Sequence, residues 1–248
     1  MGILNVTPDS FADGGRHFDF ESAINRAKEM ISEGVDIIDV GGESTRPGAD
    51  RVSEETERDR VIPVITELAK HGARISIDTM RASTAEAAIK AGASIINDVS
   101  GGLADPEMLQ TAARLGVPYI AMHWRGQSKD MNSKAIYNDV VIDVISELQE
   151  RITDALDAGI EVGNLIIDPG LGFAKDAEHN WEIIDSIDSF VDLGYPVLVG
   201  ASRKRFLGGD SPDEREQATI DLTKRLATTG VWAVRVHSVK PHKEVLAQ

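Results

Sequence analysis

Short apolar runs rich in branched side chains alternate along the chain with longer segments of helical period. The strand-like runs cover residues 2–6, 35–40, 74–78, 94–99, 118–123, 165–169, 196–202 and 233–238. Apolar residues predominate in these runs and occupy neighbouring positions, as expected for parallel strands that are buried on both faces. The pattern therefore predicts parallel strands whose two faces are both buried.

The segments between these runs carry signals for helices and for their ends. Residues 20–33 and 139–158 repeat apolar side chains three or four positions apart. Asp105 and Pro106 have the chemistry of an N-cap and a first helical residue, so a helix is expected to begin there. A glycine, which accepts the left-handed conformation of a helix C-cap, stands before most of the next strands. These glycines are Gly34, Gly72, Gly92, Gly116, Gly159, Gly194 and Gly230.

The chain has eight strand-like runs, and seven times a helical segment and a glycine lead from one run to the next. This repetition favours an α/β fold of the (β/α)8 TIM barrel type over a doubly wound sheet. No linker, low-complexity tract or short sequence repeat divides residues 1–248. The sequence therefore predicts one barrel domain over the whole chain.

Composition narrows the possible partners and the compartment. The formal net charge of −15 argues against nucleic acid, whose phosphates require a basic surface. The absence of cysteine excludes disulfides and thiolate metal sites. The apolar runs are too short to span a membrane, and the N-terminal residues lack the pattern of a signal peptide. We therefore expect a cytoplasmic protein that binds neither nucleic acid nor membrane.

Polar side chains stand at or just after the ends of the apolar runs. They are Asn5, Asp39, Asp78, Asn97, Asp98, His123, Asp168, Ser202, Lys204, Arg235 and His237. One such residue would be explained as a helix cap, but all eight strands ending this way predict a single polar cavity at the C-terminal end of the barrel. Because strand residues alternate in direction, Asp39 and Asp98 are expected to face away and serve the scaffold.

The residue types in this cavity indicate two kinds of ligand group. Carboxylates at Asp78 and Asp168, with the amide of Asn97, suit a ring that offers donors and acceptors, such as a 2-amino-4-oxo pyrimidine. Arg235 and His237 follow the last strand, near which barrels often bind phosphate. The predicted cavity therefore suits a heterocycle that carries phosphate.

Two charged clusters have simpler interpretations. Residues 54–60, "EETERDR", are expected to form a solvated helix face. In the triplet 203–205, Arg203 is expected to form a structural ion pair outside the cavity. Arg205 is placed at the cavity mouth or in solvent, and only Lys204 is assigned to the ligand.

Eight motifs, in order along the chain, resemble the dihydropteroate synthase family. They are "GILNVTPDSFADGG" (2–15), "IIDVGGESTRPGA" (37–49), "ISIDT" (75–79), "INDVSGG" (96–102), "MHWRG" (122–126), "DPGLGFAKDAEHN" (168–180), "GASRKRFLG" (200–208) and "VRVH" (234–237). The resemblance implies a homodimeric, Mg²⁺-dependent transferase of folate biosynthesis that sulfonamides inhibit. Its reaction joins 6-hydroxymethyl-7,8-dihydropterin diphosphate to p-aminobenzoate in an SN1-like displacement, giving 7,8-dihydropteroate and pyrophosphate.

The same resemblance assigns roles to individual residues of this chain. The pterin would be bound by Asp78, Asn97, Met122, Asp168, Gly200 and Lys204. The diphosphate would be bound by Asn5, Arg46, Arg235 and His237, with Asn5 also a ligand of Mg²⁺. The p-aminobenzoate would lie against Thr45, Arg46, Pro47, Phe173 and Lys204. The catalytic set would be Asp78, Asp168, Lys204, Arg235 and His237, and mobile loops are implied at about residues 7–18 and at 45–47.

Two departures from the family pattern keep alternatives open. Ser238 follows His237 where many relatives have aspartate, and Arg205 stands where many have serine. One alternative is a pterin-binding methyltransferase, which would require a corrinoid partner and would not need the "ESTRPG" segment. Another is a catalytically silent relative that binds pterin or regulates a partner.

Overall fold

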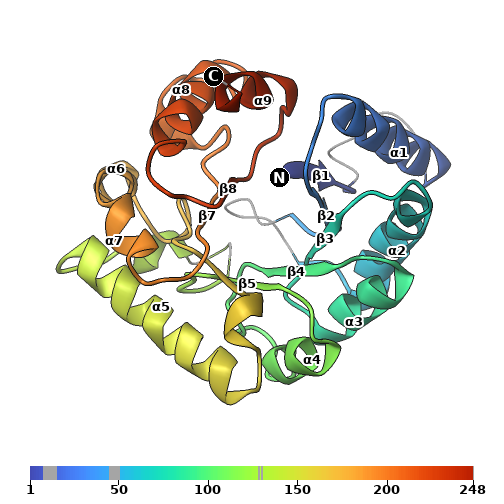
Figure 1. Ribbon diagram of the computed structural model, residues 1–248, viewed down its shortest axis with the longest axis horizontal. Helices are drawn as coiled ribbons and strands as arrows, with labels where there is room; N and C mark the ends of the chain where they lie inside the picture. Colours follow the sequence, from blue (N-terminus) through green and yellow to red (C-terminus); the bar gives the residue numbers. More distant parts are fainter. Residues whose placement is uncertain (8–15, 45–50, 128, 130, 248) are drawn as a thin grey trace.

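Short parallel strands form the centre of the protein, and helices surround them in chain order (Figure 1). The computed structural model describes residues 1–7, 16–44, 51–127, 129 and 131–247. The strands are β1 (Gly2–Asn5), β2 (Ile38–Gly41), β3 (Ile75–Asp78), β4 (Ile95–Asp98), β5 (Tyr119–Met122), β6 (Leu165–Asp168), β7 (Leu198–Val199) and β8 (Ala233–Val234). The helices are α1 (Arg16–Ser32), α2 (Glu54–Lys70), α3 (Ala82–Ala91), α4 (Met108–Leu115), α5 (Val140–Asp157), α6 (Ala177–Asp185), α7 (Ile187–Val191), α8 (Glu216–Leu226) and α9 (Lys240–Leu246). Short 3-10 turns lie at Met131–Lys134, Val162–Asn164 and Arg205–Leu207.

The strands close into a ring. β1 to β6 pair in sequence order, β7 pairs with β8, and every pairing is parallel. Two isolated parallel bridges join these sheets: Ile167 to Val197 on one side, and Gly2 to Val236 on the other. At the second junction the N–H of Ile3 donates to the carbonyl of Val236 over 2.8 Å. The predicted (β/α)8 TIM barrel is therefore confirmed.

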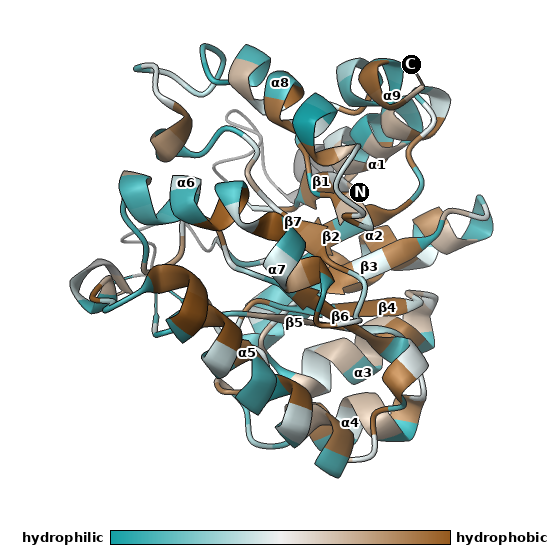
Figure 2. Ribbon diagram, turned by 60° about the vertical axis from the view of Figure 1, so that its left-hand side comes forward, coloured by the Kyte–Doolittle hydropathy of each residue, from teal (hydrophilic) through white to brown (hydrophobic). Residues whose placement is uncertain are grey.

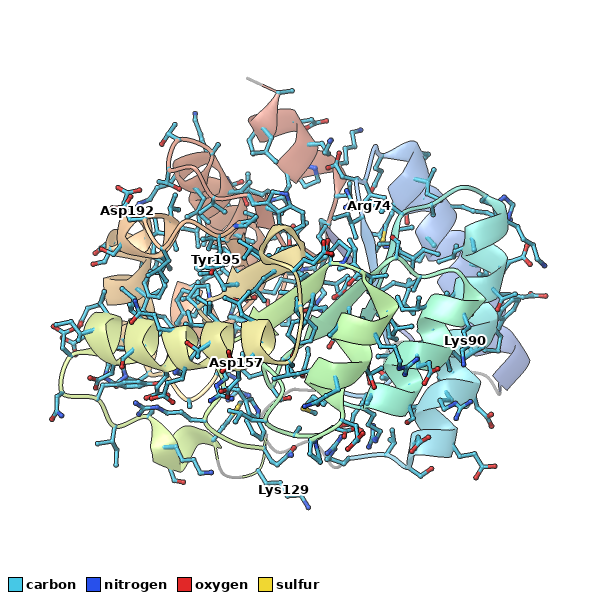
Figure 3. All side chains as sticks on the ribbon, turned by 60° about the horizontal axis from the view of Figure 1, so that its bottom comes forward. Arg74, Lys90, Lys129, Asp157, Asp192 and Tyr195 are labelled. Carbon is cyan, nitrogen blue, oxygen red and sulfur yellow. The ribbon has the colours of Figure 1, made fainter. Side chains whose placement is uncertain are left out.

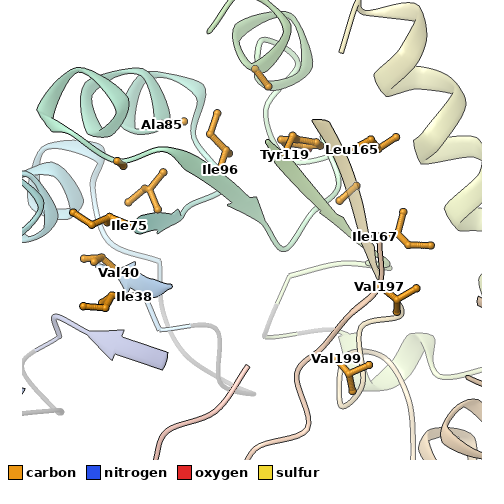
Figure 4. Packing of buried hydrophobic residues seen from close by; sticks show 14 of the residues in the cluster. Ile38, Val40, Ile75, Ala85, Ile96, Tyr119, Leu165, Ile167, Val197 and Val199 are labelled. Carbon is orange, nitrogen blue, oxygen red and sulfur yellow. The ribbon is translucent and has the colours of Figure 1, made fainter. Parts of the chain in front are cut away.

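Alternating strand residues build two separate cores. Side chains such as Ile38, Ile96 and Ile167 belong to the large cluster that packs against the helices (Figure 4). Their neighbours one position earlier form a second cluster inside the ring: Met1, Ile37, Ile95, Ile120, Ile166 and Leu198. Both faces of the strands are thus apolar, which explains the near-continuous hydrophobicity of the central strands (Figure 2). The inner cluster plugs the barrel near the starts of its strands.

Helix boundaries agree with the sequence patterns, with one correction. The segment predicted at 139–158 is α5, whose N-cap Asp139 accepts hydrogen bonds from the N–H groups of Val141 and Ile142. The expected helix start at Asp105 is wrong, because α4 begins at Met108. Asp105 instead accepts from the N–H of Glu107 and, with its other oxygen, from the N–H of Ala82. Its carboxylate therefore ties a turn to the neighbouring helix α3.

The interpretation of residues 54–60 as a solvated face is wrong at one position. Glu57 on α2 is 1% exposed, and it accepts hydrogen bonds from Thr79, Arg81 and Thr84. The other acids at the start of α2, such as Glu54, are exposed. A charge-rich sequence does not reveal which of its carboxylates turns inward, since the partners of Glu57 come from the connection after β3 and from α3.

Residues before and after the strands mark the two ends of the barrel. Arg74 and Tyr195 precede β3 and β7 at the N-terminal end, and Lys129 follows β5 at the opposite end (Figure 3). Among the described residues, no helix is long and apolar enough to cross a membrane. The polar strand ends named above all lie toward the end marked by Lys129.

All seven glycines predicted to end helices have positive φ angles, and two of them permit a matched test. A methyl group added at Gly92, where φ is 117°, would lie 2.5 Å from Cβ of Ala69. A methyl group at Gly116, where φ is 64°, would meet no described atom within 4 Å. Gly116→Ala should therefore lower the free energy of unfolding by about 1–2 kcal/mol through backbone strain alone. Gly92→Ala should cost about 1–3 kcal/mol more through overpacking. Urea unfolding measures both, and equal losses would contradict the packing at Gly92.

Candidate active site

The candidate site lies directly above the inner apolar plug and is built on the same faces of the strands. Asp39, Asn97 and Asp168 each stand two residues after an isoleucine of the plug, on β2, β4 and β6. Because side chains repeat their direction every second residue, these polar groups point into the ring. The plug and the site are therefore successive layers of one barrel interior.

Arg235 connects two of the carboxylates. Its Nε donates to Oδ2 of Asp39 and its Nη2 donates to Oδ2 of Asp78, each over 2.6 Å. Burial acts to lower the pKa of Arg235, but the two carboxylates raise it overall. The guanidinium therefore stays charged and neutralises acids that face each other inside the barrel.

Asp39 is the main residue that the sequence interpretation misplaced. It was expected to face away from the cavity, yet it is fully buried and its Oδ2 also accepts from Nδ2 of Asn97 over 3.0 Å. A signal for this position does exist in the sequence. Residues 37–39 read Ile-Ile-Asp, residues 95–97 Ile-Ile-Asn, and residues 166–168 Ile-Ile-Asp. Aligning these three strands places Asp39 with Asn97 and Asp168, whereas Asp98 falls one position later.

Asp98 does serve the scaffold, as expected. It is fully buried and accepts hydrogen bonds from the hydroxyl of Tyr119 and from groups of Ser100 and Gly102. Those partners hold the turn that follows β4 against β5. The single-residue difference between Asn97 and Asp98 thus separates a site residue from a structural one.

Asp78 has an unusual protonation equilibrium. Burial raises the pKa of its carboxyl to about 7, although Arg235 opposes this shift and Asp39 adds to it. Near neutral pH the group can therefore accept or donate a hydrogen bond to a ligand. A carboxyl of this kind suits a ring whose edge carries both donors and acceptors.

Asp168 and Lys204 form the opposite side of the site across Gly200. A methyl group at Gly200 would lie 3.8 Å from Oδ2 of Asp168 and 4.0 Å from Nζ of Lys204, so the bare backbone leaves room between them. Oδ1 of Asp168 accepts from the N–H of Gly170 over 2.7 Å. Burial lowers the pKa of Lys204 to about 8, against the opposing effect of Asp168. The space between these groups is lined by both signs of charge.

An apolar wall borders this polar pair. Met122 clusters with Met80 and Val99, and Trp124 and Phe173 pack against that cluster. Nζ of Lys204 lies 4.6 Å from the centre of the Phe173 ring and also donates to the carbonyl oxygen of Leu171. The predicted residues Met122, Phe173, Gly200 and Lys204 are therefore brought together at one side of the cavity.

His237 is oriented by Ser202, not by its neighbour in sequence. Nδ1 of His237 lies 2.9 Å from Oγ of Ser202, which also accepts from the backbone N–H of His237. Ser238 instead accepts from Arg203, whose Nε donates to Glu216 over 2.7 Å. The structural ion pair expected of Arg203 is confirmed, and a serine at 238 leaves the imidazole held. Arg205 is exposed.

Asn5 supplies an oxygen at the rim of the site. A methyl group at Gly41 would lie 3.7 Å from Oδ1 of Asn5 and 3.5 Å from Oδ2 of Asp78, so the missing side chain leaves these oxygens open to a shared space. The described residues contain no cluster of three or more His, Cys, Asp or Glu that would hold a metal. One amide oxygen beside a phosphate fits Mg²⁺, which keeps few protein ligands.

Other predicted residues lie elsewhere. Thr45, Arg46 and Pro47 lie outside the described residues, as do residues 8–15 of the first predicted loop. His123, expected among the polar strand ends of the cavity, is instead 1% exposed and bonded to Lys175 and Glu147. It follows the inward-facing Met122, so its side chain has the opposite direction.

Comparisons with known proteins agree over the whole chain. The sequence pattern of the pterin binding enzyme family matches residues 1–237. The chain is 47% identical to the dihydropteroate synthase of Mycobacterium leprae, over 99% of this chain and 90% of that protein. It is 48% identical to that of Bacillus subtilis, over 97% of this chain and 83% of that protein.

Solved structures of dihydropteroate synthases also resemble this chain over its whole length. The dihydropteroate synthase of Xanthomonas albilineans with 4-aminobenzoic acid superposes with a TM-score of 0.94 at 41% identity, over 100% of this chain and 90% of that one. The Yersinia pestis enzyme in a sulfonamide complex gives a TM-score of 0.93 at 40% identity, over 100% and 91%.

The pKa of Asp78 generates a test of the electrostatics. A carboxyl whose pKa is about 7 when folded and about 3.9 when unfolded stabilises the fold below pH 4, and that stability is lost as pH rises through 7. Asp78→Asn cannot ionise. Its free energy of unfolding relative to the parent should therefore rise by about 2–3 kcal/mol between pH 5 and pH 8.

Urea unfolding at the two pH values measures this difference. The exposed Asp157→Asn is the matched control and should show no such change. A flat or falling difference for Asp78→Asn would contradict a raised pKa.

Proposed function

The chain belongs to the dihydropteroate synthase family of pterin-binding enzymes, and we propose that it joins a dihydropterin diphosphate to p-aminobenzoate, releasing pyrophosphate. It is a transferase. The observation that carries the proposed reaction is the pairing of a ring-complementary set with an arginine and a histidine. Asn97 and Asp168 stand on one interior layer with Asp39, Arg235 joins Asp39 to Asp78, and His237 is held by Ser202.

In the proposed complex, the buried polar groups of the site bind the edge of the pterin ring. Asp78 and Asp168 would bond the amino and ring N–H groups of the pterin, and Asn97 would contribute an amide. Lys204 would donate to the oxo group, while Met122 and the bare backbone of Gly200 would leave a flat slot. The buried, preorganised positions of these groups support this assignment.

The charge distribution supports departure of pyrophosphate. As the bond to the leaving group breaks, positive charge develops on the pterin methylene and negative charge on the diphosphate. Asp78 and Asp168 would lie near the cation, whereas Arg235 and His237 would stabilise the anion. Bound Mg²⁺ would neutralise diphosphate charge, with Asn5 as its protein ligand.

The acceptor needs little acid–base help. The aniline nitrogen of p-aminobenzoate is neutral near pH 7, so it attacks without a strong general base. Phe173 and Lys204 would border it, which leaves positioning as the main contribution of the chain. The Xanthomonas albilineans enzyme bound to 4-aminobenzoic acid supports this acceptor, and the Yersinia pestis complex supports inhibition by sulfonamides.

The proposal extends to the organisation of the chain. A single domain is proposed because the large apolar cluster runs from Leu4 to Leu226. The homodimer and the cytoplasmic location stay predictions. The methyltransferase and silent alternatives are less favoured, because Arg235 is held by the carboxylate of Asp39 and His237 by the hydroxyl of Ser202.

Release of pyrophosphate with and without p-aminobenzoate tests the proposed reaction. Release should require p-aminobenzoate and should match the formation of dihydropteroate. Release that is independent of p-aminobenzoate would point to hydrolysis or another acceptor. No release by folded protein that still binds pterin would favour the silent alternative.

Calorimetry on two variants tests the division of roles. Lys204→Ala should weaken pterin binding about 10- to 100-fold, as expected for loss of a charged hydrogen bond, with a small effect on pyrophosphate. Arg235→Lys keeps a cation between Asp39 and Asp78 but loses the forked geometry, so it should mainly weaken pyrophosphate binding. Equal losses of both ligands in both variants would contradict this division.

A further inference from the structure

A buried lysine lies behind the proposed site, and none of the roles assigned above uses it. Lys175 is 8% exposed, and its Nζ lies 2.8 Å from Nδ1 of His123. The same atom donates to the carbonyl oxygens of Gly170 and Phe173, each over 3.1 Å. Three acceptors around one Nζ match the three N–H bonds of an ammonium group. Burial lowers the pKa of Lys175 to about 7, which means that keeping the ammonium charged in this buried position costs free energy.

His123 and Glu147 continue this cluster toward α5. Because Nδ1 accepts from Lys175, the ring hydrogen stands on Nε2, which donates to Oε2 of Glu147 over 2.9 Å. Burial, and next the charge of Lys175, lower the pKa of His123 to about 4, so the imidazole is neutral near pH 7. Arg125 completes the cluster by bonding Glu147. Glu147 on α5 thus fixes the His123 ring in one tautomer, and that ring in turn holds Lys175.

The segment of residues 169–176 has a backbone that needs such support. Gly170, Gly172 and Ala174 have φ angles of 69°, 76° and 47°. The conformation at Ala174 is unfavourable for a residue with a Cβ and persists only when its surroundings hold it. The hydroxyl of Tyr137 donates to the carbonyl of Ala174 over 2.9 Å. Lys175 and Tyr137 therefore hold three carbonyls of this segment from behind.

The front of the same segment sets the position of Lys204. The carbonyl of Leu171 accepts from Nζ of Lys204, and the Phe173 ring lies beneath that ammonium. The side chain of Lys204 passes close over Gly172, where an added methyl group would lie 2.7 Å from its Cδ. These contacts of Lys204 are all made by residues of the segment 169–176, two of whose carbonyls accept from Lys175.

We propose that Lys175 is a positioning residue, which, locked by His123, holds residues 169–176 so that Leu171 and Phe173 fix Lys204 at the meeting point of the two substrates. The functional part of this inference rests on the proposed function. The positional part does not, because it concerns contacts within the chain. The two parts are tested by different measurements.

The positional part is tested on a matched pair at His123. His123→Gln keeps an oxygen that accepts from Lys175, whereas His123→Leu removes the acceptor, and neither changes a formal charge near pH 7. The probe is the rate at which acetic anhydride modifies Lys204 as pH varies, read by peptide mass spectrometry. The apparent pKa of Lys204, lowered by burial to about 8, should stay low in the glutamine variant and rise toward its ordinary value in the leucine variant. Equal behaviour of the two variants would overturn the proposal.

The functional part is tested by Lys175→Met, with the exposed Lys224→Met as control. Lys175→Met should raise the KM for p-aminobenzoate about tenfold and weaken pterin binding, while pyrophosphate affinity and the KM of the control stay unchanged. A merely structural role would lower the melting temperature or the folded fraction and leave the KM of the folded protein unaltered. That result would overturn the positioning role. Absence of turnover in the parent chain would contradict the proposed function and leave the measurement on Lys204 valid.

Discussion

The arrangement of this barrel depends on one buried interaction, the guanidinium of Arg235 held between Asp39 and Asp78. Two carboxylates at the centre of a barrel repel each other and lose their hydration, and a partner inside the ring is required to offset both effects. The charge of Arg235 thereby offsets that of the two carboxylates within the polar layer. The same interaction orients Asn97 through Asp39 and leaves Asp78 with a proton equilibrium near neutral pH.

This layer is possible because successive residues of each strand point alternately outward to the helices and inward to the ring. Outward side chains such as Val40 and Ile77 pack on the helices, and inward ones such as Ile95 and Ile166 plug one end of the ring. The inward positions that remain, two residues further on, are free to be polar. Stability and ligand chemistry therefore come from the same strands without competing for the same faces.

Regular features of the sequence predicted most of the fold. The alternation of apolar runs with helical segments gave the barrel, and the glycines with positive φ marked helix ends, because both follow from local geometry. The direction of single side chains was harder, since strands that are apolar on both faces carry no alternation to count from. Asp39 was misplaced for that reason, and His123 was assigned to the cavity although it faces α5. Glu57 and Lys175 were not predictable from spacing, because their partners come from distant segments.

A crystal structure of the chain with a pterin and pyrophosphate bound tests the central interaction most directly. We expect the ring to bond Asp78, Asn97, Asp168 and Lys204, with Arg235 still held between Asp39 and Asp78 and its remaining N–H groups bonded to the pyrophosphate. A ring bound away from these residues, or an Arg235 that has left both carboxylates, would contradict it.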